Sequence, residues 1–139
     1  MADRKSYRKL ERGFKTVACD FDGTLCEDDF PEIGEPKLDV IERVKEHKAT
    51  GGKVILWTCR DGDYLTEAVI WCKKQGIEFD SVNEDIDEIK NADFGRDKSV
   101  KVFADEYWDD KAVPVEKLMD EPEKESEDRI SGILVFLGK

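Results

Sequence analysis

A short apolar run that ends in two carboxylates constrains this chain more than any other feature. The stretch 17–25 reads Val-Ala-Cys-Asp-Phe-Asp-Gly-Thr-Leu, so Asp20 and Asp22 directly follow a strand-like segment. Two carboxylates held close together repel each other and raise each other's pKa unless a cation or a chemical task holds them there. We therefore expect later segments to supply the remaining ligands of a cation and a binding site for an anionic group.

The composition indicates one charged globular domain. The chain has 139 residues, of which 39% are apolar and 41% charged, and its net charge is −11. That charge argues against a general nucleic-acid binder, because phosphate backbones bind basic surfaces. No apolar run approaches the roughly 18 residues that span a bilayer, so we expect no membrane partner. We divide the chain into a basic N-terminal arm, 1–14, and a single domain, 15–139.

The four cysteines predict a reducing compartment. They form no Cys-x-x-Cys pair and the chain has one histidine, which argues against a zinc site. In an unstapled chain of this size, reduced thiols are typical of the cytoplasm. A reactive thiol needs a base or a cation that lowers its pKa, so packing is favoured over nucleophilic chemistry for Cys19 and Cys59.

Apolar runs alternate with helical patterns along the chain. We predict strands at 15–19, 53–57, 79–82, 100–108 and 133–137, and helices at 38–50, 65–72 and 115–119. The loop-like, acidic segment at about 23–37 predicts a short flap, and 83–98 predicts a loop with at most a short helix. This order predicts an α/β fold: a three-layer, doubly wound, Rossmann-like and mostly parallel sheet of about five strands, without a large cap domain.

Polar side chains follow three of the predicted strands. Asp20 and Asp22 follow the first strand, Thr58 the second, and Asp109–Asp110 the fourth. Ligands of such sheets bind at the carboxyl ends of the strands, so these residues are expected to meet. Converging carboxylates suit Mg²⁺, which prefers oxygen ligands. Lys98 or Lys101, together with Thr58, would suit a phosphate group beside the cation.

These motifs resemble those of the haloacid dehalogenase (HAD) superfamily of phosphohydrolases. The stretch 20–25, Asp-Phe-Asp-Gly-Thr-Leu, resembles the first motif, and 54–58, which ends in Thr58, looks like the second. Lys101 and the strand that ends at Asp109–Asp110 are similar to the third and fourth motifs. The resemblance covers residues 15–112 and implies a small, capless phosphoric monoester hydrolase.

The resemblance assigns a role to each matching residue. Asp20 would be the nucleophile that forms an aspartyl-phosphate, and Asp22 the general acid and base. Mg²⁺ would be held by Asp20, the backbone carbonyl of Asp22, Asp109 and Asp110. Thr58 and Lys101, with Lys98 as the alternative lysine, would bind the phosphoryl group. Gly23 would permit the tight turn and line the substrate site. The substrate site would also be lined by Cys59 and Arg60, which follow Thr58. For Arg60, a surface ion pair is the alternative.

The missing cap leaves the substrate open. The segments between the motifs hold no cap domain, and capless relatives take bulky substrates or close the site with a partner subunit. The expected partner is a small phosphorylated substrate, either a nucleotide or polynucleotide end or a sugar phosphate, and a second copy of the chain could close the open site. The competing functions are a phosphoacceptor signalling module of the receiver type and a non-catalytic binding module. In receivers, however, the lysine comes last in the chain, whereas here Lys98 and Lys101 precede Asp109.

Overall fold

The computed structural model describes residues 13–91 and 101–119 of the chain, and its centre is a parallel sheet of four strands. These strands are β1 (Thr16–Cys19), β4 (Lys53–Leu56), β5 (Ser81–Val82) and β6 (Glu106–Trp108), in the order β5-β4-β1-β6. Every neighbouring pair is parallel, with Cys19 opposite both Leu56 and Trp108. The α/β class and the parallel sheet are therefore confirmed. The predicted strand at 133–137 and the basic arm, apart from 13–14, lie outside the described residues.

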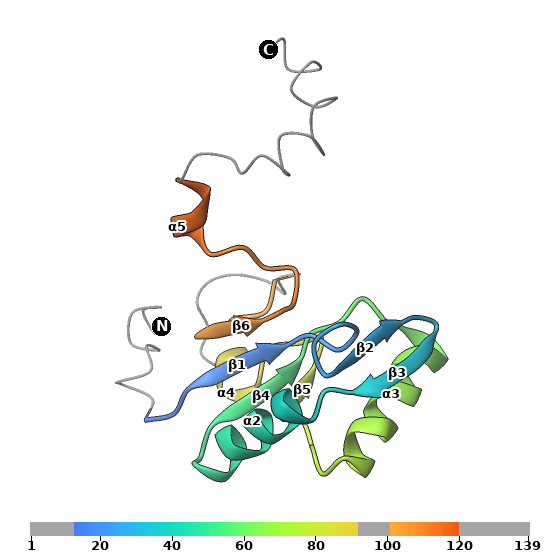
Figure 1. Cartoon of the computed structure of the whole chain (residues 1–139). Coiled ribbons are helices and arrows are strands. Elements are labelled where there is room, and N and C mark those ends of the chain that lie inside the picture. The colour runs from blue at the N-terminus through green and yellow to red at the C-terminus, as the bar shows by residue number, and fades with distance from the viewer. Residues whose placement is uncertain (1–12, 92–100, 120–139) are drawn as a thin grey trace.

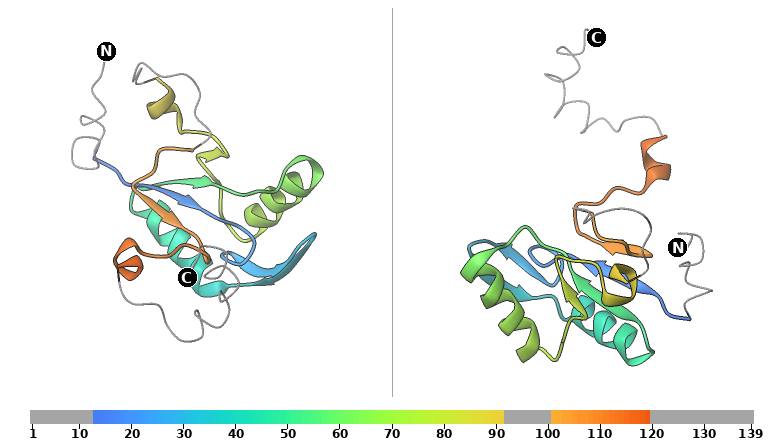
Figure 2. Two further views of the ribbon diagram at one scale, coloured as in Figure 1. Left: turned by 90° about the horizontal axis from the view of Figure 1, so that it is seen from above. Right: turned by 180° about the vertical axis from the view of Figure 1, so that it is seen from behind.

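Helices cover both faces of this sheet (Figures 1 and 2). Alternate residues of β1 and β4 point to one face, where they pack against α2 (Leu38–Ala49) and α3 (Gly62–Lys74). On the other face Ala18 and Ile55 pack against α4 (Asp87–Lys90) and against Val102. Because β1 and β4 are apolar on both sides, each forms a continuous hydrophobic run in the sequence.

The strand before Asp109 is shorter than predicted. The sequence pattern predicts a strand over 100–108, whereas β6 contains only Glu106–Trp108. Val102 is 2% exposed, because it packs on the sheet face against Ala18 and Ile55 instead of pairing along the edge of the sheet. Its burial produces the same apolar signal as a strand residue would, which explains the error.

The acidic segment after β1 forms a β-hairpin. Strands β2 (Cys26–Asp29) and β3 (Glu32–Pro36) pair antiparallel as a separate two-stranded sheet (Figure 1). The sequence predicts a flap here without strands, because β2 has only one buried residue, Cys26, followed by three exposed acids. Such a strand lacks the alternation of apolar and polar residues that marks a half-buried strand. A four-residue helix, α5 (Val115–Leu118), follows β6, and within the described residues no helix is long and apolar enough to cross a membrane.

Candidate phosphoryl-transfer site

The candidate site lies where the direction of the chain through the sheet reverses. From β1 the chain proceeds through β4 to β5 on one side, and β6 then adds to the other side of β1. The carboxyl ends of β4, β1 and β6 are joined by backbone hydrogen bonds from Trp57 N to Cys19 O and from Asp20 N to Trp108 O, both 2.9 Å. Such a reversal leaves a crevice outside the strand ends, where ligands of α/β sheets bind.

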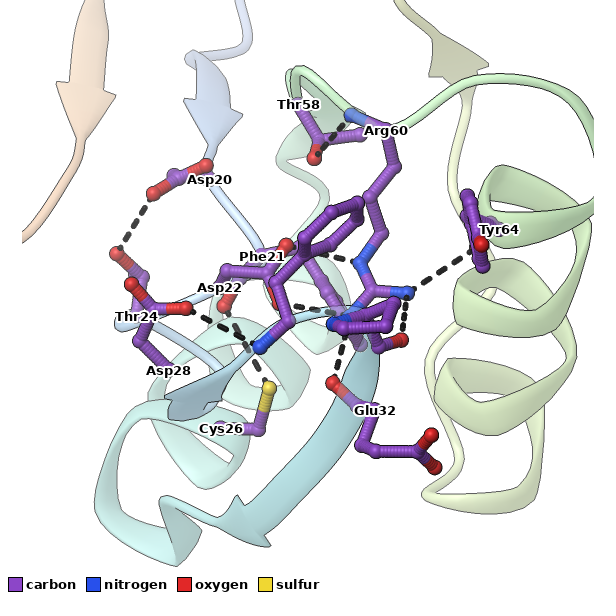
Figure 3. A network of polar contacts seen from close by, with 12 residues as sticks. Asp20, Phe21, Asp22, Thr24, Cys26, Asp28, Glu32, Thr58, Arg60 and Tyr64 are labelled. Atoms are coloured by element: carbon purple, nitrogen blue, oxygen red, sulfur yellow. Dashed lines mark hydrogen bonds and ion pairs between the residues drawn. The ribbon is translucent and has the colours of Figure 1, made fainter.

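Three of the predicted ligands form an acid cluster at this reversal. Carboxylate oxygens of Asp20, Asp109 and Asp110 lie within 4.8 Å of one another. Thr24, which is 7% exposed, joins them: its Oγ1 accepts the Asp110 N–H at 3.0 Å and lies 3.4 Å from Asp20 Oδ2 (Figure 3 shows the contact with Asp20). The oxygen-only donor set of this acid cluster fits a hard divalent cation such as Mg²⁺.

The electrostatics of Asp20 reflect this crowding. Burial is the largest cause that raises the pKa of its carboxyl group, to about 6, and the neighbouring charges of Asp109 and Asp110 raise it further. Hydrogen bonds from the backbone of Phe21 and from Thr24 act in the opposite direction. The ionised form of Asp20 is thus disfavoured in the protein alone, and a cation among the three carboxylates would relieve the repulsion.

Gly23 makes room for the acid cluster. Its φ is +87°, and a Cβ atom built there would lie 2.3 Å from Asp110 Oδ2. A side chain at this position would therefore collide with a candidate ligand as well as strain the backbone. The role predicted for Gly23 in turning the chain fits this geometry.

We expect Gly23→Ala to damage the acid cluster more than Gly51→Ala damages its own turn. Both glycines have a positive φ, +87° and +93°, but nothing lies within 4 Å of a Cβ at Gly51. Each substitution should cost about 1–2 kcal/mol of backbone strain, and only Gly23→Ala should also displace Asp110. Thermal denaturation with and without Mg²⁺ measures both effects. Equal losses of stability, with equal Mg²⁺-dependent stabilisation, would contradict this account of Gly23.

Asp22 lies outside the acid cluster: its side chain points away from that of Asp20 and is paired with Arg60 (Figure 3). Arg60 Nε donates to Asp22 Oδ2 and Nη2 to Asp22 Oδ1, both at 2.8 Å. The guanidinium is 1% exposed and the carboxylate 18% exposed, so the pair is largely shielded from water. The hydrogen bonds from Arg60 to Asp22 raise the pKa of the guanidinium, and they fix the direction of the carboxylate.

The same guanidinium ties the hairpin to α3. Its Nη2 also donates to Glu32 O at 2.9 Å, and its Nη1 lies 3.3 Å from Pro31 O and 3.4 Å from Tyr64 O. The rings of Phe21 and Phe30 each lie 5.0 Å from its Cζ. Sequence reasoning assigned Arg60 to substrate binding or to a surface ion pair, whereas here it is buried and its donors face Asp22 and backbone carbonyls. We therefore interpret it as a positioning residue for Asp22.

Thr58 lies at the end of β4, as predicted, and its backbone is fixed by a residue that the sequence analysis missed. Asn83, just after β5, accepts the Thr58 N–H on its Oδ1 at 2.8 Å, while Thr58 Oγ1 accepts the Arg60 N–H at 3.2 Å. The available signal in the sequence was an asparagine directly after a predicted strand, because asparagine tolerates a left-handed backbone, and Asn83 has a φ of 54° in the structure. Cys59 is exposed, whereas burial raises the pKa of the Cys19 thiol to about 12, in line with a packing role for Cys19.

The structure places a different lysine beside the acid cluster. Lys101 is exposed and its Nζ lies 5.0 Å from the centroid of the Tyr107 ring, without an ion pair among the described residues. Lys98 lies outside the described residues. Lys37, which precedes α2, donates from Nζ to Gly23 O at 2.6 Å and lines a surface pocket together with Asp109 and Asp110. Sequence analysis did not select Lys37, because it lies in the acidic segment that was interpreted as a flap.

Comparisons with known proteins identify one relative. No protein-family model and no curated protein matches the sequence. A solved structure described as a conserved protein coded by a locus from Bacteroides thetaiotaomicron is 37% identical, with a TM-score of 0.63. The match covers 71% of this chain and 78% of the Bacteroides chain. This chain belongs to the same family as the Bacteroides protein. The relationship supports the observed fold, and the description of the relative states no activity.

Proposed function

We propose that this protein is a Mg²⁺-dependent phosphatase of the HAD type that hydrolyses a phosphomonoester. The observation that carries the proposal is the acid cluster of Asp20, Asp109 and Asp110 at the reversal of the sheet, with Asp22 held apart from it by Arg60. A cation site and a separate, oriented carboxylate are the two parts that phosphoryl transfer through an aspartate requires.

The residues would share the reaction as follows. A carboxylate oxygen of Asp20 attacks phosphorus, the ester P–O bond breaks, and Asp22 gives a proton to the leaving alkoxide. In the second half Asp22 takes a proton from water, whose oxygen attacks phosphorus and releases phosphate from Asp20. The sum is ester plus water giving alcohol plus phosphate. Bound at the acid cluster, with the Asp22 carbonyl as a further ligand, Mg²⁺ would neutralise charge on the phosphoryl oxygens.

The position of Asp22 supports turnover over stable storage of a phosphoryl group. Arg60 donates to both of its oxygens, and each oxygen keeps a lone pair that can accept a proton from water once the side chain turns toward the acid cluster. The acid step requires the carboxyl group to give up one of these bonds. A second carboxylate two residues after the nucleophile can act as a base that hydrolyses an acyl phosphate, which favours a phosphatase over a receiver-type signalling module. We further propose that the enzyme acts in the cytoplasm, in agreement with its four free cysteines.

Turnover of a generic aryl phosphate tests the proposal. We expect purified protein to hydrolyse p-nitrophenyl phosphate with Mg²⁺, to lose that activity in EDTA, and to regain it when Mg²⁺ is added in excess. Asp110→Asn should raise the Mg²⁺ concentration needed for half-maximal activity about 10-fold or more, because it removes a charged ligand. Asp87→Asn, an exposed acid on α4, is the matched control and should not change it. Activity that is indifferent to the chelator would reject the cation site.

A further inference from the structure

A pocket adjoins the acid cluster on the side of α2. It is open to solvent, has a volume of about 420 Å³ and is lined by Asp109, Asp110, Trp108, Lys37, Val40 and Arg43. This volume lies in the range of small-molecule sites, which runs from about 300 to 1,000 Å³. Because Asp109 and Asp110 belong to both, a ligand at the acid cluster can extend directly into the pocket.

Among the described residues, the two cations of the pocket leave hydrogen-bond donors unused. Lys37 Nζ makes one hydrogen bond there, to Gly23 O, and an ammonium group has three N–H donors. The closest carboxylate oxygen in an ion pair with Arg43 is Glu46 Oε1, at 3.9 Å, and the Arg43 side chain is 53% exposed. Asp39 also lines the pocket, but within the described part of the chain it forms no ion pair with either cation.

Within the described residues, these two cations lack a close acidic partner although the chain is acidic. The net charge is −11, and some other described lysines have such a partner: Lys48 lies 2.9 Å from Asp80, and Lys15 is paired with Glu106. Two cations that lie beside one pocket, without close acidic partners in the described part of an acidic chain, have the charge pattern of an anion-binding site.

The guanidinium of Arg43 is held in place before any ligand binds. Its Cζ lies 5.3 Å from the centroid of the Trp108 ring, at a distance typical of cation–π contacts. The indole is itself fixed, because its Nε1 donates to Glu106 at 2.9 Å and the His47 ring meets it at 5.9 Å. A planar cation on a fixed indole needs little reorganisation to bind a carboxylate or a phosphate.

We propose that Lys37 and Arg43 form a subsite for a second anionic group, a carboxylate or a phosphate, of the phosphorylated substrate. The inference rests on the proposed function and narrows the substrate class to phosphomonoesters with a second negative charge. The reacting phosphate lies at the acid cluster, the second anion at Lys37 and Arg43, and the carbon skeleton between them contacts Val40 and Trp108.

Two probes that differ in one charge test the subsite. They are 3-carboxyphenyl phosphate and its neutral isostere 3-carbamoylphenyl phosphate, titrated in Mg²⁺ into the Asp20→Asn protein, which should not hydrolyse them. We expect the carboxylate to bind about 10-fold more tightly, as charge-assisted hydrogen bonds allow, and to shift the Trp108 indole N–H resonance. The preference should fall to about twofold or less in Lys37→Gln and Arg43→Gln combined. The side-chain amide in Lys37→Gln still has an N–H group that can donate to Gly23 O.

The control is Lys45→Gln, which removes one positive charge from α2 at a lysine whose partner is Glu42, 3.4 Å away. It should leave the preference unchanged. Equal affinities for the two probes, no binding of either, or a preference that survives the double substitution would overturn the subsite. Hydrolysis of the same two probes by the wild-type protein is measured in a separate assay. A clear preference without turnover would reject the phosphatase, and turnover without preference would reject only the subsite.

Discussion

Asp20→Asn is expected to abolish turnover of p-nitrophenyl phosphate, with a fall in kcat of about 10⁴-fold or more, as for other enzymes that lose their nucleophile. The amide has nearly the same shape as the carboxylate, but it is a poor nucleophile and cannot form the aspartyl-phosphate. The fold should persist, because the substitution removes one charge from a crowded acid cluster in which burial and neighbouring carboxylates disfavour the ionised form of Asp20. The initial rate in saturating Mg²⁺ measures turnover, and circular dichroism measures whether the fold persists.

Asp109→Asn is the matched control for this substitution. It also removes one charge from the acid cluster, but it leaves the nucleophile in place, so excess Mg²⁺ should restore part of its activity. No Mg²⁺ concentration should restore Asp20→Asn. Turnover by Asp20→Asn above about one hundredth of the wild-type rate, with mass spectrometry excluding deamidation back to aspartate, would refute the nucleophile.

Asp22→Asn should lower kcat by about 10²–10⁴-fold, the usual contribution of a general acid or base. Arg60→Lys should lower kcat about 10-fold or more with little change in KM, because a lysine keeps the charge but cannot make the two-pronged contact that orients Asp22. The reason for a kcat effect is that Arg60 is buried and faces Asp22, away from open solvent. Steady-state kinetics of both single variants on one aryl phosphate separates the effect on kcat from the effect on KM.

The double variant separates a positioning role of Arg60 from a substrate-binding role. If Arg60 acts only through Asp22, Asp22→Asn combined with Arg60→Lys should be about as slow as Asp22→Asn alone, since coupled residues are not additive. A rise in KM that adds to the effect of Asp22→Asn would show that Arg60 touches the substrate. Thermal denaturation must accompany the kinetics, because a change in a buried ion pair also costs stability.

Much of the fold followed from local patterns. The apolar runs that became β1 and β4, and the stripes at 38–50 and 65–72 that became α2 and α3, are recorded in the spacing of apolar residues. The prediction failed where burial and strand formation separate. Val102 is buried without lying in a strand, and β2 is a strand with only one buried residue, Cys26. Periodicity reports burial, and it reports backbone pairing only when the two coincide.

The sequence by itself determined the acids at the strand ends. Asp20, Asp22 and Asp109–Asp110 each follow an apolar run, and parallel strands bring their carboxyl ends to one edge, so the acid cluster was predictable before any coordinates. Only the tertiary structure decided which cationic side chains lie beside these acids. Arg60 meets Asp22 across 38 positions, and Lys37 reaches the pocket from the start of α2. The physical reason is that long side chains take their direction from neighbouring elements, and the spacing of residues along a chain does not record that direction.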